Sequence, residues 1–412
     1  MKSSLIIFLF SINSLNTFSQ WEIVTPYPQL NDLNTVFFSD INNGWAAGNS
    51  GTILHTNNAG TNWAIQNSTT TETLYSIDFI NSNTGWCVGS LGQVLKTVNG
   101  GNDWNLIDTL PMGDFVYGVD FFDQNNGWAA EFFGKICHTT DGGENWVVQL
   151  YEQMYWLWSI SFPNQTHGWA VGLNTASQEG IIINTTDGGA NWGVQYNLYQ
   201  RPFYFVQFID ANDGWVVGSY GTILHTTNGG INWSAQASGS ANNLYSVNFV
   251  DLNIGWACGM NGKILHTTNG GNLWEEQVSG TDKFIFSILF TDSNNGWAVG
   301  QEGIMLHTTN GGVTDVVNEE PNIISFELNQ NYPNPFNPST TISWQLPIAG
   351  DVTLKIFNTL GEEITTLVND EYQDAGAHSS LFIVNSSLPS GIYFYQLKAG
   401  ELISTKKMIL LK

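Results

Sequence analysis

Residues 244–277, with the sequence LYSVNFVDLNIGWACGMNGKILHTTNGGNLWEEQ, contain one complete unit of an internal repeat. Short runs rich in apolar and β-branched residues alternate in it with the turn sequences DLN, MNG and TNGG. Glycine and asparagine supply the positive φ angles that tight hairpin turns require. The unit therefore predicts four short antiparallel strands, over 244–249, 255–259, 263–267 and 273–277.

The Gly-Trp dipeptide of this unit occurs seven times in the chain, at intervals of 41, 42, 41, 46, 41 and 41 residues. A four-stranded unit repeated about every 41 residues is typical of a β-propeller, in which each unit forms one blade. The sequence thus predicts an all-β fold with a seven-bladed β-propeller over 20–312. The tryptophans of the dipeptide are Trp45, Trp86, Trp128, Trp169, Trp215, Trp256 and Trp297.

A second tryptophan ends each unit except the seventh, where Asp315 stands in its place. Trp21 lies 42 residues before Trp63, the second tryptophan of the first unit, and opens the strand-like sequence WEIV. We expect this N-terminal strand to complete the seventh blade, because a ring closed in this way leaves no long sheet edge exposed.

The turn before the second tryptophan carries the pattern S/T-x-D-x-G-x-x-W, as in Thr139, Asp141, Gly143 and Trp146, and five units have Asn in the Asp position. This pattern is the Asp-box or BNR repeat. Residues 21–312 resemble the photosystem II assembly factor-like propellers. Since similar units occur in sialidases, glycosidases and sortilin-type receptors, the resemblance predicts the fold more sharply than the function. We interpret the box as a folding device, in which a short Asx side chain caps its own turn.

Beyond Gly312 the repeat stops, and an acidic linker over 313–325 precedes a second domain over 326–412. Alternating segments predict a small Ig-like β-sandwich of about seven strands there. The domain resembles the type A sorting domain of the type IX secretion system in Tyr332, Pro333, Asn334, Pro335, Phe336, Gly391, Tyr393, Lys406 and Lys407. The resemblance implies that type IX secretion machinery is a partner and that the protein is secreted, or held at the outer surface, by a Gram-negative bacterium.

Residues 1–19 have Lys2, an apolar run and Ser19 near a cleavage point, which is the pattern of a signal peptide. No segment has the roughly 18 consecutive apolar residues of a membrane helix, so we expect no membrane span. The formal net charge of −24 argues against a nucleic-acid partner, because phosphate binding depends on Lys and Arg. Cys87, Cys137 and Cys258 do not share one position of the repeat, and we expect free, buried thiols.

Two classes of enzyme have propellers of this kind, and each needs particular side chains for catalysis. A sialidase needs three arginines around the substrate carboxylate, and the chain has only Arg201. A glycoside hydrolase needs two carboxyl groups, and Glu131, Glu179 and Glu302 in loops between second and third strands keep this alternative open. We nevertheless expect a non-enzymatic protein, without cofactor.

A metal site is suggested by two repeated patterns. Five units have His before Thr in the third strand, but equivalent residues of different blades lie too far apart for one ion. The Asp-x-Asn-x-Gly turns that begin at Asp40, Asp123, Asp210, Asp251 and Asp292 resemble half of a calcium loop and lack its bidentate Glu. We interpret the histidines as packing residues and the turns as hairpin turns, predict no metal site, and leave weak calcium binding at the turns open.

A binding site is expected where the units differ from one another. The fourth unit carries the insertion NTASQEG at 174–180, on the face opposite the Asp boxes. The candidate ligand-binding residues beside it are Tyr155, Trp156, Tyr199 and Arg201, extended by Phe132, Phe133 and Tyr220. Tyr204 recurs as an aromatic residue in other units, so we assign it to a packed layer. Aromatic platforms suit sugars and peptides. We therefore predict a monomer that binds a protein or glycan through the loop face of blades three to five.

Overall fold

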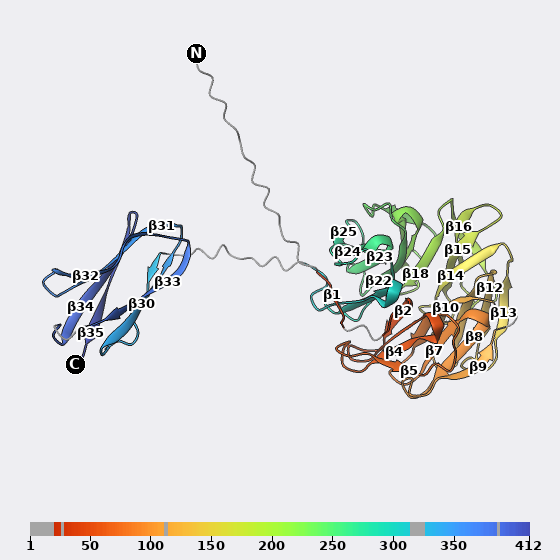
Figure 1. The fold of residues 1–412 in the computed structure, drawn as a ribbon. Helices are drawn as coiled ribbons and strands as arrows, with labels where there is room; N and C mark the ends of the chain where they lie inside the picture. The colour runs from red at the N-terminus through yellow and green to blue at the C-terminus, as the bar shows by residue number, and fades with distance from the viewer. Residues whose placement is uncertain (1–19, 26–28, 111–113, 314–325, 385–387) are drawn as a thin grey trace, which may run out of the picture. The chain divides into compact units, whose positions relative to one another are not determined.

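The computed structural model describes residues 20–25, 29–110, 114–313, 326–384 and 388–412 (Figure 1). The chain divides into two compact units, Met1–Val313 and Thr314–Lys412. The signal peptide expected over 1–19 lies outside the described residues, as does the linker after Val313. No described helix is long and apolar enough to cross a membrane.

The first unit is a ring of seven four-stranded antiparallel sheets, as predicted. In blades one to six the strands run from the centre of the ring outward in chain order. The strands of blades one to three are β2 Leu33–Phe38, β3 Gly44–Gly48, β4 Ile53–Thr56, β5 Ala64–Gln66; β6 Leu74–Phe79, β7 Gly85–Gly89, β8 Gln93–Thr97, β9 Asn105–Thr109; and β10 Val116–Phe121, β11 Gly127–Glu131, β12 Lys135–Thr139, β13 Val147–Tyr151.

Blades four to six continue the pattern, and blade seven contributes three strands of its own. These strands are β14 Tyr155–Ser161, β15 Gly168–Asn174, β16 Glu179–Thr185, β17 Gly193–Tyr199; β18 Phe203–Phe208, β19 Asp213–Gly218, β20 Ile223–Thr227, β21 Ser234–Gln236; β22 Leu244–Phe249, β23 Gly255–Gly259, β24 Ile264–Thr267, β25 Glu275–Gln277; and β26 Ile285–Phe290, β27 Gly296–Gly300, β28 Met305–Thr308.

The Gly-Trp dipeptide joins neighbouring blades. Trp45 of blade one stacks on Phe79 of blade two, with ring centroids 3.7 Å apart. A Cβ atom at Gly44 would lie 2.4 Å from the ring of Phe38, so only glycine fits beside that ring. Every pair of adjacent blades repeats the stack, at 3.4 to 3.7 Å, and the Trp297–Phe38 pair closes the circle.

The N-terminal strand completes blade seven, as predicted. β1 (Glu22–Ile23) pairs antiparallel with β28, so that Glu22 lies opposite His307. Trp21 is fully buried, and its indole N–H donates to Oε1 of Gln277 at 3.0 Å. The first and last strands of the ring are thereby held in one sheet.

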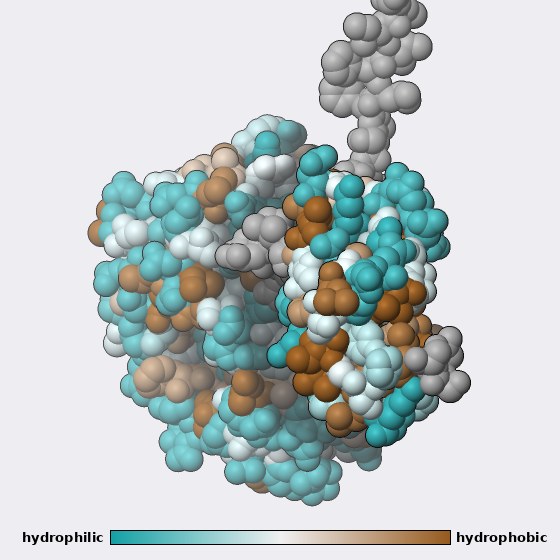
Figure 2. All heavy atoms as spheres, turned by 90° about the vertical axis from the view of Figure 1, so that its left-hand side faces the viewer, coloured by the Kyte–Doolittle hydropathy of each residue, from teal (hydrophilic) through white to brown (hydrophobic). Residues whose placement is uncertain are grey.

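The second unit is the predicted sandwich of two sheets, ordered β29-β30-β33 and β32-β31-β34-β35. Its core contains Trp344, Tyr395 and Phe336, all at most 2% exposed. In Figure 2, which draws the residues of both units, hydrophobic residues form separate patches among hydrophilic ones on the side that faces the viewer. The strands are β29 Glu327–Leu328, β30 Ser339–Leu346, β31 Gly350–Phe357, β32 Glu363–Gln373, β33 Gly376–Ile383, β34 Gly391–Ala399 and β35 Leu402–Leu410.

Candidate functional site

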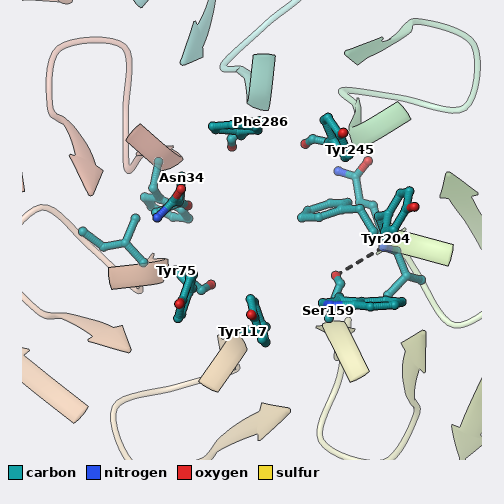
Figure 3. A pocket seen from close by; sticks show the side chains of 18 of the residues that line it. Asn34, Tyr75, Tyr117, Ser159, Tyr204, Tyr245 and Phe286 are labelled. Atoms are coloured by element: carbon teal, nitrogen blue, oxygen red, sulfur yellow. Dashed lines mark hydrogen bonds between the residues drawn. The ribbon is translucent and has the colours of Figure 1, made fainter. Parts of the chain in front are cut away.

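The inner strands of the seven blades surround a central channel with a volume of about 540 Å³. One residue near the start of each inner strand lines its mouth, the second residue in six strands and the fourth residue in β14. Six of these seven residues are aromatic (Figure 3). The rings pack side by side, as Tyr75 and Tyr117 do at a centroid distance of 4.4 Å. We call this set the mouth ring: Asn34, Tyr75, Tyr117, Trp158, Tyr204, Tyr245 and Phe286.

Four blades place a serine at a second level of the channel wall. A register shift in each inner strand, such as the one between Leu74 and Ser76, precedes this level. Ser159 Oγ accepts the amide of Val206 in the next blade at 3.2 Å, and Ser76, Ser246 and Ser287 make the same bond. The channel wall therefore also joins the blades.

Two aspartates occupy a third level, three residues beyond the mouth ring. Asp78 Oδ2 accepts the amide of Phe121 at 2.7 Å, and Asp120 Oδ2 accepts the amide of Phe162 at 2.6 Å. Three later blades bond the next blade's amide through a neutral oxygen instead, from Ser161, Gln207 and Asn248. The two remaining blades place Phe37 and Leu289 at this level.

Burial raises the pKa values of both aspartates, to about 6 for Asp78 and about 8 for Asp120. The negative charge of Asp78 raises the pKa of Asp120 further. Both side chains are half-buried on the channel wall, and neither forms an ion pair within the described ranges. Near neutral pH the pair thus retains part of its protons.

This carboxylate pair was not predicted from the sequence. A sign of the pair is nevertheless present in the sequence. One position of the inner strand is occupied by different residues in the seven blades, namely Phe37, Asp78, Asp120, Ser161, Gln207, Asn248 and Leu289. A charged residue at a position that is apolar in other repeats marks a wall facing a solvent-filled space. Only the ring geometry brings Asp78 and Asp120 together.

A second pocket, of about 720 Å³, lies on the loop face of blades four and five. Tyr199 and Arg201 line it together with Tyr220, and the exposed fractions of Tyr199 and Tyr220 are 63% and 61%. The Arg201 guanidinium lies over the Tyr220 ring, 4.9 Å from its centroid. Its Nη1 donates to the carbonyl of Tyr220 at 3.4 Å, and among the described residues it forms no ion pair.

Tyr220 has a left-handed backbone, with φ 52°. The equivalent residues Ser50, Leu91, Asn261 and Glu302 share this conformation, which bulky side chains rarely adopt. The turn therefore fixes the direction in which the large ring of Tyr220 projects from the face.

Phe132, Phe133 and Trp156 form an aromatic cluster beside this pocket, on blades three and four. The rings of Phe132 and Trp156 stack at a centroid distance of 4.7 Å, and Phe133 meets Phe132 edge to face at 5.1 Å. Tyr155, by contrast, packs against the core between blades three and four. Of the seven candidate residues, the structure thus gathers six into two neighbouring surface groups.

The mouth ring connects these two groups. Tyr117 lies 5.7 Å from Phe132, ring centroid to ring centroid, and Tyr204 lines both the channel and the second pocket. Tyr204 packs against Trp158 and Tyr245 in the aromatic layer expected from the repeats, and it also lines both cavities. The loop face of blades three to five and the channel mouth form one continuous surface.

The three glutamates of the hydrolase alternative do not converge. Glu131 is fully buried at the end of β11 and pairs with Lys135 at 3.1 Å, and Glu179 is the first residue of β16, so their expected places in loops are wrong. Glu302 pairs with Lys283, and Glu179 accepts the side-chain amide of Asn197 at 3.2 Å. None of the three lines either pocket described above.

The repeated residues have structural partners. The five histidines stack on the Gly-Trp indole of their own blade, as His225 does on Trp215 at 4.4 Å. In the third box, Asp141 Oδ1 accepts the amide of Asn145 at 2.9 Å. Asp40 caps its own turn in the same way, by accepting the amide of Asn42 at 2.8 Å. Within the described parts of the chain, no group of three or more His, Cys, Asp or Glu could hold a metal ion.

The sorting-signal residues divide into buried and exposed sets. Phe336 is 2% exposed in the sandwich core, and Tyr393 is 5% exposed with its hydroxyl donating to the carbonyl of Pro389. Tyr332 is 82% exposed, and Lys407 is exposed as well. The exposed residues are available to a receptor, whereas the buried ones support the fold.

A family model described as photosynthesis system II assembly factor YCF48 matches residues 13–109, 61–154, 100–201, 147–238 and 232–317. These overlapping matches span well over half of the chain. The chain belongs to the YCF48 family. Residues 330–411 match a secretion system C-terminal sorting domain, so this YCF48-type propeller carries a secretion signal of the type IX class. A search of curated protein sequences finds no match.

Solved structures share the propeller fold. A structure described as YCF48 bound to D1 peptide has 20% identity and a TM-score of 0.61, covering 71% of this chain and 98% of that one. YCF48 from Cyanidioschyzon merolae has 21% identity and a TM-score of 0.60, covering 70% and 98%. The WD40 propeller of Doa1, at 10% identity, has a TM-score of 0.55 and covers 70% and 95%.

Proposed function

We propose that this YCF48-type propeller is a secreted or surface-attached, non-enzymatic module that binds a segment of another protein on the loop face of blades three to five. The observation that carries the proposal is the group of exposed aromatic rings around Arg201 in a pocket of about 720 Å³. Rigid aromatic side chains and arginine are the residue types that dominate binding energy at protein interfaces.

A protein segment is favoured over a glycan by two observations. The related structure described as YCF48 bound to D1 peptide shows that a member of the family binds a peptide. The pocket also presents the Arg201 guanidinium, which suits the carboxylate or carbonyl groups of a polypeptide. A glycan ligand is the other outcome of the test below.

The second unit of the chain supports export of the propeller from the cell. The sorting domain over 330–411 implies contact with secretion machinery. We propose that the propeller acts outside a Gram-negative cell, where the acidic surface of the chain keeps it soluble.

The experiment is a selection with the mature chain, 20–412, against a displayed random-peptide library and a glycan array. We expect peptides to be enriched, and their affinity to fall at least tenfold in Tyr199→Ala/Arg201→Ala. Ile231→Ala, which removes an 80% exposed side chain on the Asp-box face, is the matched control and should not change the affinity. Enrichment of glycans alone, or of no ligand at all, overturns the proposal.

A further inference from the structure

We propose that the central channel is a second binding site, which adjoins the loop-face pocket at Tyr204, and that it takes the ammonium group of a lysine side chain from a polypeptide partner. The aromatic mouth ring would surround the alkyl chain, and the carboxylates of Asp78 and Asp120 would face the ammonium. The channel volume of about 540 Å³ lies within the range of ordinary ligand sites.

The charge of the channel is uncompensated. Among the described residues that line it there is no Lys, Arg or His, while two carboxylates stand on adjacent blades. Half-buried carboxylates without a cation are unfavourable, because one backbone amide for each replaces only part of their lost hydration. A bound cation would remove this cost.

The ring itself does not require these charges. Asn248 accepts the amide of Phe290 at 2.8 Å, and it does in blade six what Asp78 and Asp120 do in blades two and three. A neutral side chain therefore meets the structural need at this level. The negative charge is an additional property of the two earlier blades.

The surroundings favour an organic cation over a metal ion. A calcium ion requires six to eight oxygen ligands, whereas Phe37 and Leu289 leave part of this level apolar. Six aromatic rings at the mouth attract a cation through their faces and pack against methylene groups. The formal charge of −24 would draw a basic segment towards the protein.

The test is a calorimetric titration of the full mature chain at pH 8 with the blocked peptide acetyl-Gly-Gly-Lys-Gly-Gly-amide. Parallel titrations use the norleucine peptide, which lacks the ammonium, then cadaverine as a free alkylammonium, and MgCl₂. We expect the lysine peptide to bind at least tenfold more tightly than the norleucine peptide. Ile231→Ala should bind it like the unmodified chain.

Two variants test the carboxylates in opposite directions. Asp78→Asn/Asp120→Asn keeps an oxygen for each backbone amide and should weaken lysine binding at least tenfold. Asn248→Asp adds a third carboxylate and should strengthen it, so the proposal remains testable even if the double variant folds poorly.

Equal binding of the norleucine peptide, or unchanged binding by both variants, overturns the proposal. Tighter binding of cadaverine than of the peptide assigns the channel to free amines, and displacement of the peptide by equimolar Mg²⁺ assigns it to metal ions. Either result contradicts a polypeptide lysine. Because no loop-face ligand is used, a negative result leaves the loop-face proposal to its own selection experiment.

Discussion

Trp21 and Phe290 meet edge to face, with ring centroids 5.5 Å apart and ring planes at 87°. The second tryptophan of each other blade makes the same contact with the phenylalanine at the end of its own inner strand, at 5.7 to 5.9 Å. Trp21 thus fills, from the other end of the chain, the place in which the seventh repeat has no tryptophan. The ring is closed by side-chain packing as well as by the pairing of β1 with β28.

Replacing Trp21 with alanine should destabilise the propeller by about 3–5 kcal/mol, because a fully buried indole is removed from the core between blades six and seven, where the N-terminal strand completes the last blade. The free energy of unfolding in urea, followed by tryptophan fluorescence, measures this loss. Leu30→Ala, at a side chain 72% exposed, is the control and should change the free energy by less than about 0.5 kcal/mol. A loss below about 1 kcal/mol for Trp21→Ala would show that β1 does not hold the ring.

The two channel aspartates should make stability fall as pH rises. Their pKa values are raised in the folded chain, to about 6 and about 8, so the folded state holds more protons than the unfolded state between about pH 4 and pH 8. Their protonated forms fit the channel, and stability is lost as they ionise. The other titratable groups that line the channel are Tyr75, Tyr117, Tyr204 and Tyr245, and burial raises the pKa of Tyr117 to about 12.

Asp78→Asn/Asp120→Asn should remove that loss. We expect the variant and the unmodified chain to be equally stable near pH 4, and the variant to be more stable at pH 8.5 by at least about 2 kcal/mol. Urea unfolding at a series of pH values gives the difference. If the two curves stay parallel from pH 4 to pH 8.5, the carboxylates are not perturbed by the channel.

Substitutions of Tyr332 and Phe336 should affect the sorting domain differently, the first through its export and the second through its stability. Tyr332→Ala removes an 82% exposed ring, so it should leave the unfolding temperature of the sandwich unchanged and lower export several-fold. Phe336→Ala should destabilise the sandwich by about 3–5 kcal/mol, because that ring is buried in the core. The secreted fraction in a producing bacterium and calorimetry of the purified chain measure the two effects.

Leu360→Ala serves as the control for Tyr332→Ala, since Leu360 is 81% exposed on the same unit and outside the motif. It should alter neither export nor stability. Normal export of Tyr332→Ala would show that the receptor does not read this ring.

Most of the fold could be predicted because each repeated residue has the same local task in every blade. The Gly of Gly-Trp leaves room for a phenylalanine ring, the box caps its turn, and the missing seventh tryptophan points to Trp21. The fourth strand of the quoted unit starts at Glu275, two residues later than expected, because the turn extends further than its glycines indicate.

The site could be predicted only in part. Loop residues that differ between repeats pointed to Tyr199, Arg201 and Tyr220, which line one pocket. The pairing of Asp78 with Asp120 depends on the radius and register of the whole ring, and a chain pattern does not contain these. Glu131 was expected in a loop but is buried, because Lys135 and Cys137 contact it from the adjoining strand.

Binding of a protein segment to the loop face of blades three to five is measured by the affinity of the peptide selected on the mature chain, for the unmodified chain, Tyr199→Ala/Arg201→Ala and Ile231→Ala. Loss of the Tyr199 ring and the Arg201 guanidinium should lower the affinity at least tenfold, which corresponds to about 1.4 kcal/mol or more. We expect this loss together with an unchanged affinity for Ile231→Ala. Equal affinities for all three proteins would rule out the loop face as the binding site.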